Sequence, residues 1–463
     1  MILLQELNLN YRWSPIYWQT ANLIVDSGSL DTDANDATNY GKIGIAIASV
    51  KKQGVNIEIP LINEAGFGFE PDEINNRIIF GLKGINGINT KISQAIIQNR
   101  PYTSMEDFAQ KIIDTKIVEN QHMIKLIKAG CFTELHNADR AVTMDWFLKK
   151  YCFNPIKSLT LSQLGKLREK QLIPDELNKC VKILLLKDYI LDDEGFYSNY
   201  IDSNRKPLKR GYHDRYYILD DSSQPVFKDY FSENCIVGVK DEYFLVSERM
   251  ILKEAENYIK PFREWMNSAD ALNRYNLSMY LDLWEKWANG NEAHWSMSAL
   301  TYYDQKHELE DINEDKYGIV NFNELPEEPV PYEFYTRYIN GELKRIPKYV
   351  INRIAGTVIN ADNNHFMVSL LTKYGLVNVK MNKGHYAFYN KSISQMGEDG
   401  KSHRVEESWL KRGQMIIVSG IRIGDTFYPR IYNDTIYKHT VALIKEVNKD
   451  GTLLLQYERT KNE

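Results

Sequence analysis

Cysteine is scarce and unpaired in this sequence, which argues against a disulfide framework and against a cysteine-based zinc site. The four cysteines are far apart, and none belongs to a Cys-x-x-Cys pair: Cys131, Cys152, Cys180 and Cys235. No apolar run approaches the roughly 20 residues of a membrane-spanning helix. The first residues also lack the basic region of a signal peptide. We therefore expect a soluble protein of a reducing cytoplasm.

A surplus of positive charge is also absent, because 57 Lys and Arg residues face 62 Asp and Glu residues. A nucleic-acid-binding protein of this balance must concentrate its positive charge locally. The densest basic patch is interleaved with Tyr and His residues and consists of Arg205, Lys206, Lys209, Arg210 and Arg215. A nucleic-acid contact is one interpretation of this patch, and a solvated loop is the other.

Clustered carboxylates of the kind that hold two metal ions for phosphoryl transfer are not evident. The early Asp31-Thr32-Asp33 lies in a polar connector, and the pairs Asp192-Asp193 and Asp220-Asp221 are typical of loops. The histidines do not have metal-ligand spacing. We therefore predict no catalytic residue, no metal site and no cofactor on this chain.

A cluster of glycine and asparagine, Gly84 to Asn89, stands between an apolar run and a helical pattern. Both residue types tolerate positive φ, so the cluster predicts a tight turn between two short helices. Asn89 or Thr90 can cap the second helix, whose first N–H groups then form an anion site suited to phosphate. The alternative is a plain turn between two core helices.

The remaining patterns indicate an α+β multidomain protein of two to four domains. Helical spacing predominates before about residue 140, and strands predominate after residue 346. Five strands are expected at 354–359, 366–370, 376–381, 414–420 and 426–431, with a helix near 386–389. This order predicts an OB-type barrel, which commonly binds single strands by aromatic stacking. Its candidate contact residues are Tyr374, Tyr386, Tyr389, Phe427 and Arg430.

We expect four regions: a helical region at 1–60, a helix-hairpin-helix domain at 61–140, a mixed region of unclear role at 141–345, and the barrel at 346–463. The acidic, proline-bearing stretch Glu324 to Pro331 is the clearest linker signal. Gln163 to Leu167 loosely fits the Gln-plus-apolar pattern of a peptide that binds a sliding clamp, and such short motifs also arise by chance.

Several motifs resemble, in order, the C-terminal half of the C-family replicative DNA polymerases, the bacterial and phage DNA polymerase III alpha subunits. Tyr17-Trp18-Gln19-Thr20-Ala21-Asn22-Leu23 is similar to a helix near the end of the fingers. Pro60-Leu61-Ile62-Asn63 is similar to the segment that follows. Ile79-Phe80-Gly81-Leu82-Lys83 leads into the hairpin. Ala129-Gly130-Cys131-Phe132 and Arg140 resemble the end of that domain. Together these motifs cover about residues 10–140.

This resemblance implies a domain that grips duplex primer–template DNA and a barrel toward the single-stranded template. The implied backbone contacts are Lys83, Gly84, Gly87, Asn89, Thr90 and Lys91, with Arg100 nearby. Asn89 replaces the second glycine of the family hairpin, and the catalytic palm has no counterpart here. The resemblance thus implies part of a split or truncated polymerase, not catalytic by itself, with Mg²⁺ and the palm carboxylates on a partner chain.

Two other functions remain open. The chain could be a stand-alone DNA-binding replication accessory protein built from the same hairpin and barrel. It could instead be an interaction scaffold of the replisome in which residues 141–345 do the main work. The sequence alone does not decide between them.

Overall fold

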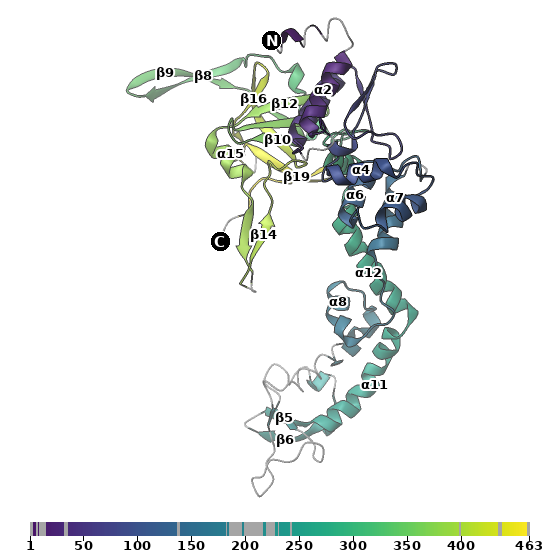
Figure 1. The fold of residues 1–463 in the computed structure, drawn as a ribbon. Coiled ribbons are helices and arrows are strands. Elements are labelled where there is room, and N and C mark those ends of the chain that lie inside the picture. The colour runs from purple at the N-terminus through teal and green to yellow at the C-terminus, as the bar shows by residue number, and fades with distance from the viewer. Residues whose placement is uncertain are drawn as a thin grey trace. The chain divides into compact units, whose positions relative to one another are not determined.

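The computed structural model describes residues 3–5, 8, 15–31, 36–136, 139–181, 183–184, 197–198, 216–218, 227–229, 231–240, 243–397, 400–433 and 438–460 (Figure 1). The predicted basic contacts Arg205, Lys206, Lys209 and Arg210 lie outside these residues. Of the acidic pairs weighed as metal ligands, only Asp31 lies inside them.

The chain divides into two compact units, of which the first combines residues 1–151 with residues 287–463. The second unit consists of residues 152–286. The region expected at 141–345 is therefore shared between them, and its last part belongs to the same unit as the barrel. No helix in the described residues is long and apolar enough to cross a membrane.

The first unit begins with α2 (Pro15–Ser27) and α3 (Tyr40–Lys52), which pack against each other. Asn39 caps α3 by accepting a hydrogen bond from the N–H of Lys42. One face of each helix is buried at helical spacing, through Ile16 and Leu23 and through Ile43, Ile47 and Val50. A small sheet follows, in the order β1 (Asn56–Glu58), β3 (Arg77–Ile79) and β2 (Glu70–Asp72).

The predicted hairpin follows β3, but only its second arm is an α-helix. The first arm is a single 3₁₀ turn, η1 (Leu82–Gly84), and the second is α4 (Thr90–Gln98). Gly81 packs closely at the start of the first arm, since a Cβ there would lie 2.3 Å from the carbonyl carbon of Gly68. Further helical segments follow: α5 (Met105–Phe108) with a π turn (Ala109–Ile113), α6 (Asn120–Lys128) and α7 (Arg140–Phe147).

The C-terminal strands form the predicted closed barrel of five strands, consistent with an OB-type fold. They are β10 (Asn352–Asp362), β11 (Met367–Thr372), β12 (Gly375–Lys380), β15 (Met415–Ile423) and β16 (Thr426–Pro429). The barrel closes because β10 pairs with both β11 and β15, while β12 pairs in parallel with β16. Alternate side chains point inward, so Val358, Leu370, Val379 and Phe427 are fully buried together.

Additional elements surround the barrel. α15 (Lys383–Asn390) lies between β12 and β15 in the chain, as the sequence predicts. β13 (Ile393–Met396) and β14 (Ser402–Glu406) form a hairpin, β17 (Tyr432–Asn433) and β18 (Lys438–His439) another, and β19 (Val441–Val447) with β20 (Leu453–Gln456) extends the sheet beyond β15. Two segments come before the barrel: α13 (Glu292–Leu300) and α14 (Glu314–Tyr317).

The linker predicted at Glu324 to Pro331 lies between a 3₁₀ turn, η7 (Phe322–Glu324), and an unpredicted hairpin. This hairpin consists of β8 (Pro331–Ile339) and β9 (Glu342–Tyr349), which pair with each other and with no other sheet of the described chain. Its two strands extend away from the barrel at the left of Figure 1.

The second unit has a core of its own, formed by residues such as Leu167, Ile251, Phe262 and Ala271. Its main helices are α8 (Leu164–Glu169), α11 (Glu248–Met266) and α12 (Ala269–Ala288), the last of which runs to the unit boundary. Its sheet has the order β4 (Tyr197–Ser198), β5 (Tyr216–Ile218), β7 (Tyr243–Ser247) and β6 (Ile236–Lys240).

Candidate nucleic-acid interface

The turn of the hairpin is anchored by hydrogen bonds to two other segments. Asn86 donates its N–H to the carbonyl of Ala299 at 2.8 Å and its side-chain amide to the carbonyl of Ser298 at 3.0 Å. Gly87 donates its N–H to the hydroxyl of Tyr40 at 3.0 Å. Gly87 is exposed with φ of +86°, a conformation that L side chains rarely adopt. The turn is therefore held in a fixed position at the surface.

Asn89, not Thr90, caps α4. Its side-chain oxygen accepts a hydrogen bond from the N–H of Ile92 at 3.0 Å. The first turn of a helix leaves N–H groups without intrahelical partners, and the helix dipole favours an anion there. Lys91 is exposed on this first turn and adds a positive charge to it.

Lys83 and Arg100, which were expected to face DNA, instead turn their donors into the protein. Lys83 is 4% exposed, and its Nζ donates to the carbonyl of Asp36 at 3.2 Å. Arg100 donates to the carbonyls of Ile62 at 2.7 Å and Ala65 at 2.5 Å. In this conformation both cations support the segments around the hairpin. Gly84 lies against aromatic rings, because a Cβ there would be 2.9 Å from the ring of Phe80.

Three other cations, which the sequence did not single out, gather beside the hairpin. We call Lys125, Lys128 and Arg412 the cationic cluster. The guanidinium of Arg412 lies 4.7 Å from the ring centre of Tyr40, whose hydroxyl accepts the N–H of Gly87. The Nζ of Lys128 lies 5.9 Å from the ring centre of Trp295. The cluster thus contains residues from α6 and from the loop before β15.

The cationic cluster is partly buried and has no acidic partner among the described residues. Burial lowers the pKa of Lys125, and the charge of Arg412 lowers it further. Burial likewise lowers the pKa of Lys128 to about 8, with a further contribution from Lys125. Burial also lowers the pKa of Arg412. Because buried charges are normally paired, such a group of cations is suited to a bound anion.

The barrel candidates fall into two classes. Tyr386, Tyr389 and Phe427 are 3%, 7% and 0% exposed, so these three belong to the barrel core and cannot stack on a base. Arg430 is exposed, and its guanidinium donates to the carbonyl of Pro429 at 2.9 Å. Tyr374 is 41% exposed, and its hydroxyl donates to Glu314 at 2.8 Å. Arg430 and Tyr374 are thus accessible, and their contact with DNA stays a prediction.

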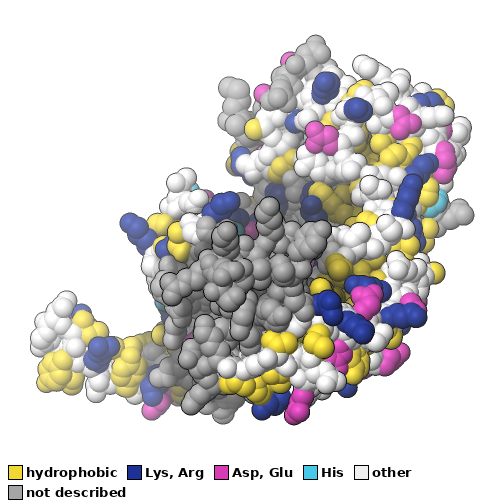
Figure 2. Space-filling model, turned by 90° about the horizontal axis from the view of Figure 1, so that it is seen from below, with side chains coloured by type: hydrophobic (Ala, Val, Ile, Leu, Met, Phe, Trp, Pro, Cys, Tyr) yellow, Lys and Arg dark blue, Asp and Glu magenta, His cyan; other side chains and the backbone are white. Residues whose placement is uncertain are grey.

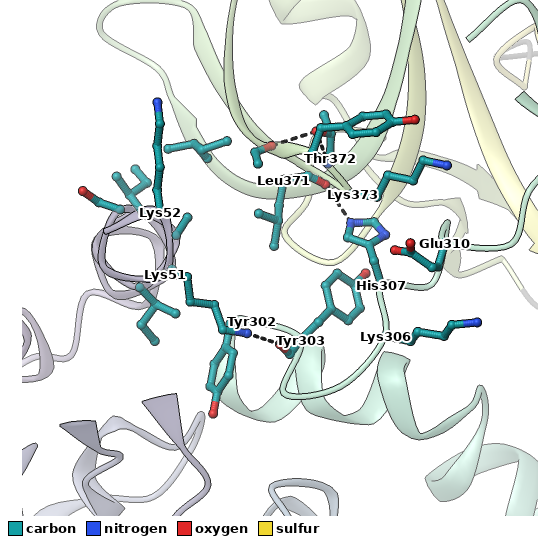
Figure 3. Close-up of a pocket in the computed structure, with 18 of the residues that line it drawn as sticks. Lys51, Lys52, Tyr302, Tyr303, Lys306, His307, Glu310, Leu371, Thr372 and Lys373 are labelled. Atoms are coloured by element: carbon teal, nitrogen blue, oxygen red, sulfur yellow. Dashed lines mark hydrogen bonds between the residues drawn. The ribbon is translucent and has the colours of Figure 1, made fainter. Parts of the chain in front are cut away.

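Tyr374 also lines a pocket of about 870 Å³ between α3, the Tyr302–Glu310 segment and the β11–β12 turn (Figure 3). Lys51 closes one side by donating to the carbonyl of Tyr303 at 2.7 Å. His307 closes another, with Nε2 placed 3.0 Å from the carbonyl oxygen of Leu371 and Nδ1 accepting the N–H of Leu309. Burial lowers the pKa of His307, which favours its neutral form. Through these two contacts, the Tyr302–Glu310 segment connects α3 to the barrel.

Two further expectations concern other sites. In the clamp-motif candidate Gln163 to Leu167, Leu164 and Leu167 are buried in the core of the second unit, and Gln163 takes part in a capping box with Thr160. Its apolar side chains are therefore not available to a partner in this conformation. Among the described residues, no group of three or more His, Cys, Asp or Glu side chains could hold a metal ion.

Sequence reasoning could have found two of the three residues of the cationic cluster. Lys125 and Lys128 are three positions apart on a predicted helix, so they share a face. Arg412 follows them by nearly 300 positions and gave no signal of its own.

Comparison with known proteins finds a matching motif and similar polymerases. A family model described as a helix-hairpin-helix motif matches residues 54–142. Over an alignment of 470 residues that covers the whole chain, the sequence is 38% identical to a probable DNA polymerase YorL of Bacillus subtilis (strain 168). It has the same identity to a DNA-directed DNA polymerase of Bacillus phage SPbeta. The DNA polymerase III subunit alpha of Chlamydia trachomatis is 28% identical over 165 residues, which are 35% of this chain and 11% of that protein.

The chain spans 34% of the length of the Bacillus and phage relatives. The resemblance inferred from the motifs is thereby confirmed, since the chain is similar along its full length to one stretch of a phage-type DNA polymerase. Its helix-hairpin-helix motif is confirmed as well.

Proposed function

We propose that this chain forms the C-terminal part of a replicative DNA-directed DNA polymerase and binds primer–template DNA without sequence preference. The observation that carries the proposal is the cationic cluster beside the hairpin turn. A phosphate near Gly87 and the start of α4 would meet the helix dipole, Lys91 and the cluster together. Because these groups contact phosphate and not base edges, they position the duplex without reading it.

The barrel would hold the single-stranded template, through Tyr374 and Arg430 among its accessible residues. OB-type barrels commonly bind single strands in this way.

The catalytic carboxylates and their Mg²⁺ would lie on a separate chain that carries the palm. The chain spans 34% of the length of the Bacillus and phage relatives, so the rest of such a polymerase would supply the palm. A sliding clamp is a further proposed partner. The burial of Leu164 and Leu167 argues that its contact lies somewhere other than Gln163 to Leu167.

A stand-alone DNA-binding replication accessory protein is the second candidate. The hairpin, the cationic cluster and the barrel lie in one compact unit, so this unit could bind DNA without a palm. An activity assay distinguishes the polymerase proposal from the accessory-protein proposal. A mixture with the chain encoded by the neighbouring gene should extend a primer only if the polymerase proposal is correct.

The DNA-binding proposal is tested with a variant that combines Lys91→Glu, Lys128→Gln and Arg412→Gln. We expect its affinity for a fluorescent primer–template duplex at low salt to fall by about tenfold or more, because each phosphate contact releases counterions. The slope of log Kd against log salt should also decrease by about 2 to 3, one unit for each contact removed.

Lys260→Glu is the matched control, since Lys260 is exposed on α11 in the second unit. This variant should bind as the wild type does. Circular dichroism should show that all variants keep the native helix content. Unchanged duplex binding by the triple variant, or no duplex binding by the wild type at low salt, would refute the proposal.

A further inference from the structure

The β8–β9 hairpin exposes large side chains that pack against nothing else in the described part of the chain. Its strands pair from Pro331 with Tyr349 to Ile339 with Glu342, and Asn340 and Gly341 form the turn with φ of +53° and +84°. An isolated two-stranded hairpin is only marginally stable in water, and exposed apolar strands promote aggregation. Because the hairpin gains so little from its own packing, its exposed side chains are candidates for a binding role.

Alternation along the strands separates two faces of different chemistry. From the register, one face carries Phe334, Thr336 and Tyr338 opposite Pro347, Arg345 and Leu343. We call this the Phe334 face. The opposite face carries Glu333, Tyr335, Arg337, Ile339, Glu342, Lys344, Ile346 and Lys348. Both acidic residues of the hairpin therefore lie on the opposite face.

The Phe334 face combines exposed rings with an unneutralised cation. Phe334 is 45% exposed and Tyr338 is 71% exposed. The guanidinium of Arg345 lies 4.2 Å from the ring centre of Phe334 and has no acidic partner among the described residues. On the opposite face, Lys348 pairs with Glu333 at 2.6 Å and Lys344 with Glu342 at 3.8 Å. Arg337 is the basic side chain of that face without an acidic partner among the described residues. Figure 2 shows apolar and basic side chains side by side along the extension at its left.

Charge favours a polyanion as the partner. The hairpin has four basic and two acidic side chains, a net charge of +2, whereas the whole chain has a net charge of −5. We propose that the Phe334 face binds single-stranded nucleic acid, with Phe334 and Tyr338 stacking on bases and Arg345 contacting the phosphate backbone.

A single strand suits this face better than a duplex does. Base stacking on aromatic side chains requires bases that are not already stacked within a helix. A β-ribbon that reads a duplex groove needs polar side chains aimed at base edges, whereas this face has mainly apolar ones. None of the residues proposed above for duplex binding belongs to it, so the inference goes beyond the proposed function and does not depend on the cationic cluster.

The test compares two double variants of the full chain in binding to a short fluorescent oligothymidylate. Phe334→Ala with Tyr338→Ala removes the rings of the Phe334 face, and we expect about a tenfold loss of affinity from lost stacking. Tyr335→Ala with Ile339→Ala removes comparable side chains from the opposite face of the same strand, and it should bind within about twofold of the wild type.

A direct readout uses an oligonucleotide that carries 5-iododeoxyuridine and is photocrosslinked to the wild type. Tryptic cleavage after Arg337 and Lys344 releases residues 338–344, and we expect the crosslink in this peptide. The inference would be overturned by an equal loss of oligothymidylate affinity in both double variants, or by no loss in Phe334→Ala with Tyr338→Ala. Crosslinks found only in the barrel would also overturn it. Duplex binding, measured in parallel, should remain unchanged in both variants, so failure here is distinguishable from failure of the proposed function.

Discussion

Lys128 lies in the last turn of α6, where burial and the charge of Lys125 lower its pKa to about 8. A lysine with this pKa changes charge close to physiological pH, which an exposed lysine does not do. The folded state favours the neutral form, so the cationic cluster gains its full charge only below this pKa. A bound phosphate would raise the pKa again by stabilising the ammonium.

We therefore predict that duplex affinity falls as the pH rises from about 7 to about 9. The loss of the Lys128 charge should account for about a threefold decrease. Lys128→Arg keeps the charge throughout this range and should flatten the pH profile. Fluorescence anisotropy titrations at constant ionic strength measure the effect. Parallel profiles of the wild type and Lys128→Arg would contradict the assignment of the pH dependence to Lys128.

The same lowered pKa affects stability in the opposite direction. Because the unfolded chain keeps the ordinary lysine pKa of 10.5, it binds more protons than the folded chain between about pH 8 and pH 10.5. The destabilisation of the folded state by this group therefore decreases as the pH rises through that interval. A charged Lys128 is thus retained at a cost to folding, as expected for a residue that serves binding.

At the scale of elements, two glycines of the hairpin serve different purposes. A Cβ on Gly81 would meet the backbone of Gly68 at 2.3 Å, and neither backbone segment can move away freely. A Cβ on Gly87 would meet nothing within 4 Å, but φ there is +86°. The first glycine is needed for close packing, and the second for backbone conformation.

We predict that Gly81→Ala lowers the free energy of unfolding by about 3 kcal/mol or more, through overpacking. Gly87→Ala should cost only about 1 to 2 kcal/mol, from strain in the left-handed region. Urea denaturation of each variant measures both values. If both variants lost a similar free energy of unfolding, close packing against Gly68 would not be the reason that position 81 needs glycine.

The elements differ in how far a local pattern predicts them. The five barrel strands and α15 follow from alternation and spacing within a few residues, and all form as predicted. The first arm of the helix-hairpin-helix is a 3₁₀ turn where an α-helix was predicted. Gly81 and Gly84 there pack against Gly68 and Phe80, and no local pattern shows these contacts. The β8–β9 hairpin went unpredicted, although Asn340-Gly341 between apolar stretches is a hairpin signal.

On the scale of the whole molecule, the chain contains two units with separate hydrophobic cores. The core of residues 152–286 includes Leu167, Ile251 and Phe262, and all of its members come from that unit. A unit with its own core commonly folds alone. We therefore predict that residues 152–286, expressed by themselves, unfold cooperatively on heating, as followed by circular dichroism. A gradual, non-cooperative melt would contradict this prediction.

The sequence by itself determined the barrel, the position of the hairpin turn and the similarity to DNA polymerases, because each depends on residues close together in the chain. For the cap of α4 it offered Asn89 or Thr90, and the structure decided for Asn89. Only the tertiary structure decided which cations are available. Lys83 and Arg100 are turned inward, while Arg412 joins Lys125 and Lys128 beside the turn. Burial and charge pairing depend on contacts between distant segments, such as the bond from Asn86 to Ser298 across 212 positions, and no local pattern contains that information.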